Sequence, residues 1–286
     1  MTTFSLVQTH HGISCTDIER TKAVLRTIGF TDHQPGAPEP LTFRNADDDF
    51  IGQVTAPVLG DVYHTHYVEN PSTGQQIDLI EISPQALRPR DWTDPAQGDL
   101  VIGIQVDDPR SAYAAMCAAD AGESYSEPST IEAEHGLIFD WRDGQRSILT
   151  TQAPFAVLHY SDKDFPRARR FFEEVLEIEV NEIETATGTI RYRLEDIGGR
   201  VEVAVSASTR VLDFAEFGKR YPGANHFRLI NQDIDRIGRK IEETGLGGFI
   251  IPPANGFAFL RGAAGEAIET FDVAFGRMLE QAQQPA

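Results

Sequence analysis

Histidine and carboxylate residues recur in strand-like segments of the sequence, where they could bind a metal or transfer protons. The pair His10-His11 lies in the first apolar segment, and His226 lies in a similar segment far along the chain. Asp78 and Glu269 each stand four residues after a glycine. Imidazole and carboxylate groups ligate divalent metals and act as general acids and bases. Glu269 has apolar neighbours, and an unpaired charge there would be costly if buried, so a ligand role would explain it.

One succession of elements recurs four times and must position these residues. Each unit has a strand-like segment, an amphipathic helix and further strand-like pieces that end after a glycine turn. Aspartate or proline before a helix and glycine after it mark the expected helices at 18–28, 111–119, 166–176 and 234–243. The pattern predicts an α+β fold of four βαβββ modules, with two modules in residues 1–151 and two in 152–286.

The repeat resembles the vicinal oxygen chelate superfamily, which includes glyoxalase I, extradiol dioxygenases and bleomycin-resistance proteins. The resemblance rests on a strand with histidine, a following aspartate, a helix containing Phe171-Phe172 and a closing Gly-x-x-x-Glu. It implies two glyoxalase-like domains with cup-shaped mixed sheets. It also implies a divalent metal whose ligands come from the first and last strands of the modules.

Three stretches are most similar to the four-module hydroquinone ring-cleaving dioxygenases. They are Thr9-His10-His11-Gly12, Tyr63-His64-x-x-Tyr67-x-x-Asn70-x-x-x-Gly74 and Pro222-Gly223-Ala224-Asn225-His226. This resemblance implies non-haem Fe(II), with Mn, Zn or Ni as alternatives, held by His11, His226 and Glu269 from modules one and four. The corresponding positions of modules two and three are Leu100 or Val101, Ile148, Val157 and a position near Glu202, which make no convincing ligand set.

Several assignments stay open at this stage. The spacing from Asp17 favours His10 as the ligand, whereas the His-His pattern favours His11. Adjacent strand residues face opposite sides, so only one normally points into the cup, and we assign His11 to the metal and His10 to acid/base chemistry. Asp78 is a candidate fourth ligand of the glyoxalase I kind, or a solvent-facing residue.

Further residues are candidates for the wall of the cup. His64 and His66 share one face of a strand and are candidate proton donors, or surface residues. We expect four residues near the site to contact substrate: Asn225, Phe257, Phe259 and Arg261. The ring-cleaving branch tends to have a tyrosine near Phe259, so this sequence lacks a hydroxyl that could hold the substrate there.

Charge and composition exclude some classes of function. The 286 residues carry a formal net charge of −19, which disfavours nucleic-acid binding and docking on anionic lipid. No apolar run is long enough to span a bilayer, and the two cysteines form no disulfide framework. We therefore expect a soluble cytoplasmic protein, with a homo-oligomer left open.

Three hypotheses follow from the residues and the resemblance. The first is an Fe(II)-dependent dioxygenase that cleaves a hydroquinone-like or catechol-like aromatic with O2. The second is a metal-dependent isomerase or lyase of the glyoxalase type that uses Asp78. The third is a non-catalytic protein that binds a small molecule, as in drug resistance.

Overall fold

The computed structural model describes residues 6–33, 41–44, 62–81, 100–120, 136–183, 191–194, 200–206, 223–231, 233–254 and 256–272. Module one contains β1 (Leu6–Cys15), α1 (Ile18–Arg26), β2 (Thr31–Asp32), β3 (Leu41–Arg44), β4 (Val62–Asn70) and β5 (Gln75–Glu81). Module two contains β6 (Leu100–Gln105), α3 (Pro109–Asp120), β7 (Leu137–Asp140) and β8 (Arg146–Thr150).

The second half of the chain repeats the plan. Module three contains β9 (Phe155–Ser161), α5 (Phe165–Arg170), the π-helical turn η1 (Phe171–Val175), β10 (Val180–Ile183), β11 (Arg191–Leu194) and β12 (Arg200–Ser206). Module four contains β13 (Gly223–Asn231), α6 (Ile234–Thr244), β14 (Gly248–Ala254), β15 (Phe257–Arg261) and β16 (Ala267–Asp272). The predicted α+β fold of repeated modules is confirmed.

Local sequence signals account for the helix ends. Asp17 and Asp233 adopt extended backbone before their helices, and each side chain accepts a hydrogen bond from a backbone N–H in the first turn, of Arg20 and Arg236 respectively. These bonds satisfy donors that the helix itself leaves open. Gly245 ends α6 with φ 65°, a left-handed conformation that glycine adopts without steric cost.

The strands join in the order β10-β11-β12-β9-β6-β13-β1-β5-β4-β2. In each module the first strand runs parallel to the last one, as β1 does to β5 and β13 to β16. The first strands also pair antiparallel between modules, β1 with β13 and β6 with β9. Modules one and four therefore form one cup, and modules two and three form a second, so each cup takes one module from each of the predicted halves.

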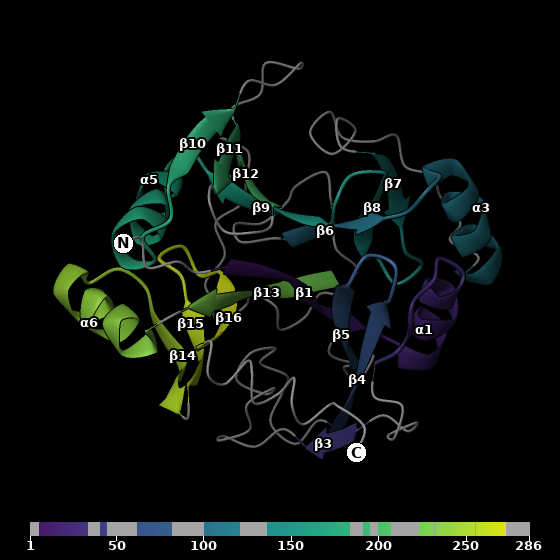
Figure 1. Ribbon diagram of the computed structural model, residues 1–286, viewed down its shortest axis with the longest axis horizontal. Helices are drawn as coiled ribbons and strands as arrows, with labels where there is room; N and C mark the ends of the chain where they lie inside the picture. Colours follow the sequence, from purple (N-terminus) through teal and green to yellow (C-terminus); the bar gives the residue numbers. More distant parts are fainter. Residues whose placement is uncertain are drawn as a thin grey trace.

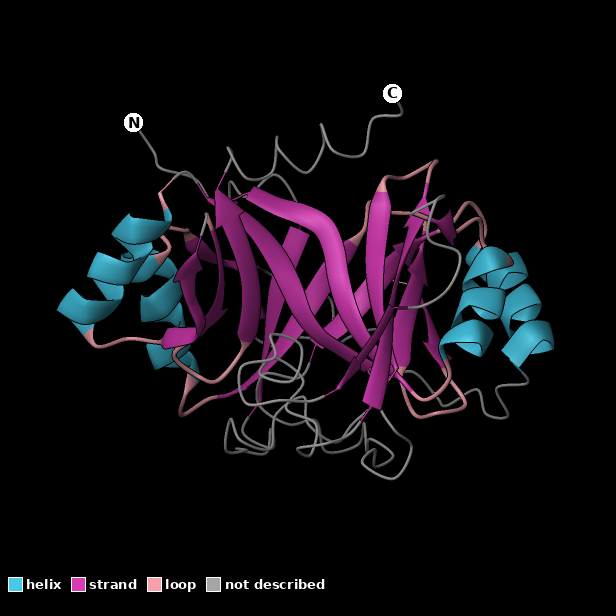
Figure 2. Ribbon diagram, turned by 90° about the horizontal axis from the view of Figure 1, so that it is seen from below, coloured by secondary structure: helices cyan, strands magenta, loops and turns pink. Residues whose placement is uncertain are grey.

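The helices lie at the two outer ends of the strand layers. Figure 1 shows α1 beside α3 at one end and α5 near α6 at the other, and Figure 2 shows the strands between these two helical layers. The large core cluster contains the strand residues that face these helices, such as Ile13, Leu79, Phe227 and Ile268. The alternate residues of the same strands therefore face the cups. Within the described part of the chain, no helix is long and apolar enough to cross a membrane.

Candidate metal centre

Strand β1 brings His10, rather than His11, into the cup of modules one and four. Ile13 and Cys15 belong to the helix-facing core, and β1 keeps a continuous register with β5 from His10 to Cys15. Because side chains alternate along a strand, His11 shares the helix-facing side, whereas His10 and Gly12 face the cup. Both histidines are only 1% exposed. The structure thus makes His10, rather than the predicted ligand His11, the histidine of β1 that faces the cup.

The registers of β1–β5 and β13–β16 show that modules one and four contribute equivalent residues. Gly12 pairs with Asp78 and lies two residues after His10. Arg228 pairs with Glu269 and lies two residues after His226. His10 is thus equivalent to His226, and Asp78 to Glu269. Each module supplies one imidazole and one carboxylate to the same cup.

These side chains form a compact buried cluster. Ligand atoms of His10, Asp78 and His226 all lie within 4.8 Å of one another. Nε2 of His10 lies 3.4 Å from Oε2 of Glu269, and Nε2 of His226 lies 4.0 Å from the same oxygen. All four residues are at most 5% exposed. Asp78, an open question in the sequence, is a member of the cluster and does not face solvent.

Burial sets the protonation states of the cluster. Desolvation, with further contributions from the Arg228 charge and the nearby histidines, holds the pKa of His10 well below its usual value. Desolvation also lowers the pKa of His226 to about 4, although the Glu269 charge opposes it. Both imidazoles are therefore neutral at pH 7, which is the form that ligates metals. Desolvation and then the Glu269 charge raise the pKa of Asp78 well above its usual value.

Arg228 is the residue of this site that sequence reasoning missed. Its Nε donates to Oε2 of Glu269 in a buried ion pair. The position two residues after His226 puts its side chain on the cup-facing side, where module one has Gly12. Strand periodicity from His226 was the signal that could have found it.

The donor set fits a divalent metal ion. Nδ1 of His10 and Oδ1 of Asp78 are buried and make no hydrogen bond to any described residue. A buried polar atom without a partner is destabilising, and a metal would satisfy such atoms through lone pairs. Two neutral imidazoles with one or two carboxylates suit Fe(II), Mn, Ni or Zn.

Aromatic residues form part of the wall beside the metal candidates. Phe259 pairs with Glu269 across β15–β16, and its ring lies edge-on to His226 with centroids 5.1 Å apart. Phe257 contacts Phe259 at a centroid distance of 5.7 Å. Tyr67 pairs with Asp78 and lies 6.1 Å from the His10 ring. The charges of Asp78 and Glu269 and burial raise the Tyr67 pKa, which keeps its hydroxyl protonated.

Other predicted site residues lie elsewhere. His66 accompanies Val68 on the helix-facing side of β4, where its Nε2 lies 2.8 Å from Oδ1 of Asp32. His64 lies two residues before His66 and therefore on the same face of the strand. The structure places both residues away from the cup that holds Asp78. Arg261 is exposed at the end of β15. Asn225 lies in β13 where the register with β1 shifts, and its side chain is outside the described residues.

The second cup has different residues at the same positions. Gly103 pairs with Ile148 as Gly12 does with Asp78, which makes Val101 the equivalent of His10. Glu202 pairs with Val157, so Phe155, rather than Val157 as the sequence indicated, corresponds to His226. Val101, Ile148, Phe155 and Val157 belong to one apolar cluster. Apart from Glu202, the described residues at these positions of modules two and three are apolar.

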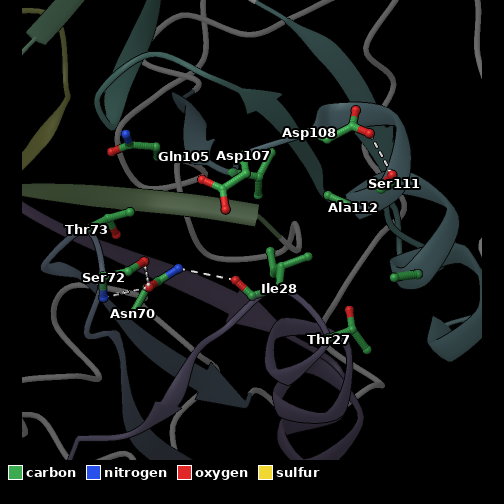
Figure 3. A pocket seen from close by; sticks show the side chains of 12 residues that line it. Thr27, Ile28, Asn70, Ser72, Thr73, Gln105, Asp107, Asp108, Ser111 and Ala112 are labelled. Carbon is green, nitrogen blue, oxygen red and sulfur yellow. Dashed lines mark hydrogen bonds between the residues drawn. The ribbon is translucent and has the colours of Figure 1, made fainter.

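A separate cavity of about 530 Å³ lies between the end of α1, the β4–β5 turn and the start of α3 (Figure 3). Its lining includes no residue of the histidine and carboxylate cluster. The side chain of Asn70 donates to the Ile28 carbonyl and accepts from Ser72, and Asp108 accepts from Ser111 at the start of α3. These polar groups are already engaged in holding turns and a helix end.

Comparison of the sequence with protein-family models and with curated proteins finds no match. Solved structures match over nearly the whole chain. Glyoxalase I from Zea mays has a TM-score of 0.63 at 13% identity, covering 99% of this chain and 97% of that one. A glyoxalase I mutant from the same plant has a TM-score of 0.61 at 14% identity, covering 97% and 96%.

A third match is the cppA protein from Streptococcus pneumoniae TIGR4, with a TM-score of 0.50 at 8% identity, covering 95% and 99%. Likeness at such low identity concerns the arrangement of the chain alone. This chain therefore has the double glyoxalase-like fold of glyoxalase I.

Proposed function

We propose that the chain is a metal-dependent enzyme of the glyoxalase type, an isomerase or lyase acting on a small substrate with two adjacent oxygen atoms. The observation that carries the proposal is the buried cluster of His10, Asp78 and His226 with Glu269 beside it. Sequence reasoning put ring cleavage first. The position of Asp78 supports the other order, because with Asp78 among the candidate ligands Glu269 is a second carboxylate beside them that can transfer a proton.

The proposed roles follow from the positions of the side chains. His10, His226 and Asp78 would hold a divalent cation, which when bound polarises a substrate oxygen and acidifies the neighbouring C–H bond. Glu269 would carry that proton on Oε2, the oxygen that lies between the two imidazoles and Arg228. Phe259 and Phe257 would limit the access of water to the reacting atoms and face an apolar part of the substrate.

A ring-cleaving dioxygenase is the second candidate, favoured by one observation. Arg228 engages Glu269, and the three residues whose ligand atoms lie within 4.8 Å of one another are two histidines and one carboxylate, His10, His226 and Asp78. Two histidines and one carboxylate are the protein ligands typical of non-haem Fe(II) oxygenases. Under this alternative the substrate is a hydroquinone-like or catechol-like aromatic, and O2 is the co-substrate.

Metal analysis of matched variants tests the site before any substrate is known. We expect about one divalent metal ion per chain in protein purified from metal-replete medium, and its loss in His10→Gln, Asp78→Asn and His226→Gln. The neighbouring His11→Gln is the control and should retain the metal. Metal retained in His10→Gln but lost in His11→Gln would refute the geometry, and metal-free wild-type protein would favour the non-catalytic binding alternative.

Two activity panels then separate the enzyme hypotheses. The Lewis-acid proposal predicts turnover of an α-oxoaldehyde, alone or as its thiol adduct, with the Ni²⁺, Zn²⁺ or Mn²⁺ form and no oxygen uptake. The dioxygenase alternative predicts oxygen uptake with a dihydroxybenzene and only with the Fe²⁺ form under anaerobic loading. Oxygen uptake that depends on His10 and His226 would overturn the isomerase proposal while leaving the metal site in place.

A further inference from the structure

The cup of modules one and four has two chemically different walls. Tyr67 pairs with Asp78 across β4–β5, as Phe259 pairs with Glu269 across β15–β16. Because Asp78 and Glu269 are equivalent, Tyr67 is the counterpart of Phe259, and the two walls differ there by a hydroxyl group. The module-four wall continues from Phe259 to the ring of Phe257 and is apolar.

Polar residues continue the module-one wall beyond Tyr67. Glu69 lies two residues after Tyr67 and pairs with Gln76, so both face the cup from their strands. Thr31 of β2 pairs with Glu69, and the backbone N–H of His33 donates to the Tyr67 carbonyl. His33, two residues after Thr31, therefore faces the same side. The module-one wall thus comprises Tyr67, Glu69, Gln76 and His33.

Hydrogen bonds through His33 hold Glu69 and Gln76 in place. Nδ1 of His33 contacts Oε2 of Glu69, and Nε2 of His33 lies 3.4 Å from Nε2 of Gln76. Because a carboxylate only accepts hydrogen bonds and an amide nitrogen only donates them, the His33 ring donates from Nδ1 and accepts at Nε2. The side chains of His33 and Glu69 are 18% and 27% exposed, so a small molecule in the cup can reach them.

Three polar groups of this wall make no hydrogen bond within the described part of the chain. They are the Tyr67 hydroxyl, Oε1 of Glu69 and Oε1 of Gln76. The hydroxyl is a donor beside Asp78 and 6.1 Å, ring to ring, from His10. The two Oε1 atoms are acceptors farther along, since two residues of a strand span about 7 Å. The wall therefore offers a donor near the metal candidates and acceptors a few atoms away.

Strand pairing alone does not require these polar groups. In module four the counterparts of Tyr67 and Gln76 are Phe259 and Ala267, and the same pairing forms there. A phenyl ring and a methyl group are thus sufficient to build an equivalent wall. The polar groups of module one need another explanation, and contact with a ligand supplies one.

We propose that the module-one wall selects the substrate of the metal-dependent reaction. The Tyr67 hydroxyl donates to a substrate oxygen beside the metal candidates, and Glu69 with Gln76 accepts from an ammonium group at the distal end of the substrate. The proposal rests on the proposed function, because it takes the metal candidates as the place of reaction. It narrows the substrate class to small molecules with two adjacent oxygens, an apolar side toward Phe257 and Phe259, and a protonated amine a few atoms away.

Three hydroxamates of equal chain length test the proposal by calorimetry on the full-length protein loaded with Mn²⁺. The probes are 4-aminobutyrohydroxamate, 4-hydroxybutyrohydroxamate and butyrohydroxamate, which share a metal-chelating end and differ only at the distal group. We expect the amine to bind about tenfold more tightly than butyrohydroxamate, the difference that one charge-assisted hydrogen bond provides, with the alcohol between them.

Variants of the wall assign the preference to its residues. Glu69→Gln should abolish the preference for the amine and leave the Mn²⁺ dissociation constant unchanged. Tyr67→Phe should weaken all three probes by a similar factor, because it removes a donor to their shared end. Glu179→Gln, an exposed glutamate, and Tyr192→Phe, a half-buried tyrosine of module three, are the matched controls and should change neither property.

The outcomes distinguish this proposal from the proposed function. Equal affinity for the three probes in a protein that binds Mn²⁺ would overturn the selective wall alone, and so would a preference for the amine that persists in Glu69→Gln. Absence of Mn²⁺ binding would overturn both. If Glu69→Gln fails to fold, Gln76→Ala introduces the residue of the module-four counterpart and should still reduce the preference.

Discussion

Replacing Arg228 with glutamine should tighten metal binding, because it releases Glu269 toward the cluster. Glu269 is 5% exposed and has the Arg228 guanidinium as its counterion. Removing one partner of a buried ion pair costs about 3–5 kcal/mol, since the remaining charge is left uncompensated. A divalent cation next to Glu269 would restore the compensation. The metal-free variant is therefore destabilised more than the metal-bound variant.

The size of the effect follows from that difference. If metal binding recovers about half of the free energy lost when Glu269 loses its counterion, the metal binds more tightly by roughly 2 kcal/mol. Each 1.4 kcal/mol corresponds to a tenfold change in dissociation constant. We therefore expect the Mn²⁺ dissociation constant to fall by about 10- to 100-fold in Arg228→Gln. Chelator-buffered titration followed by calorimetry measures it, and thermal melts of both forms report the loss of stability without metal.

A double-mutant cycle separates ligation by Glu269 from the simple removal of a positive charge. Glu269→Gln in the wild-type background should change metal affinity little, whereas the same substitution in the Arg228→Gln background should remove most of the gain. The gain that survives in the double variant measures repulsion between Arg228 and the cation. Unchanged or weaker metal binding in Arg228→Gln would refute the competition between guanidinium and metal for Glu269.

Three further predictions concern other parts of the molecule. Burial raises the pKa of Glu266 to about 7, so the folded state retains a proton that the unfolded chain loses near pH 4.5, and stability should decline as pH rises from about 4.5 through 7. The decline in the free energy of unfolding should reach up to about 3 kcal/mol at pH 8, measured by urea unfolding, and Glu266→Gln should abolish it. Parallel pH profiles of variant and wild type would contradict this prediction. Gly103→Ala would place a Cβ against the Phe155 ring, so we expect a loss of about 1–3 kcal/mol in the same assay, whereas an unchanged denaturation midpoint would show that the second cup is loosely packed. Chelation of a metal-loaded sample should lower its melting temperature, and His10→Gln should show no such shift.

Periodicity and capping residues in the sequence were sufficient to predict much of the fold. Asp17, Asp233 and Gly245 mark helix ends through local hydrogen bonds and backbone preferences, which is why short-range patterns identified them. The repeat then indicated which modules carry the candidate ligands, because the histidines and carboxylates stand in equivalent strands. The resemblance to a ring-cleaving branch went beyond these patterns, and neither the register of the strands nor the structural matches distinguish that branch.

The sequence by itself determined the modular α+β fold, since this depends on local periodicity, and it predicted the candidate ligands in modules one and four. Only the tertiary structure decided that His10 rather than His11 enters the cup, because a one-residue change of strand phase turns a side chain to the opposite face. It also brought Arg228 and Asp78 into the same cluster and turned His66 toward Asp32. The meeting of Arg228 with Asp78 depends on pairing between strands more than two hundred residues apart, β1 with β13, which no local pattern specifies.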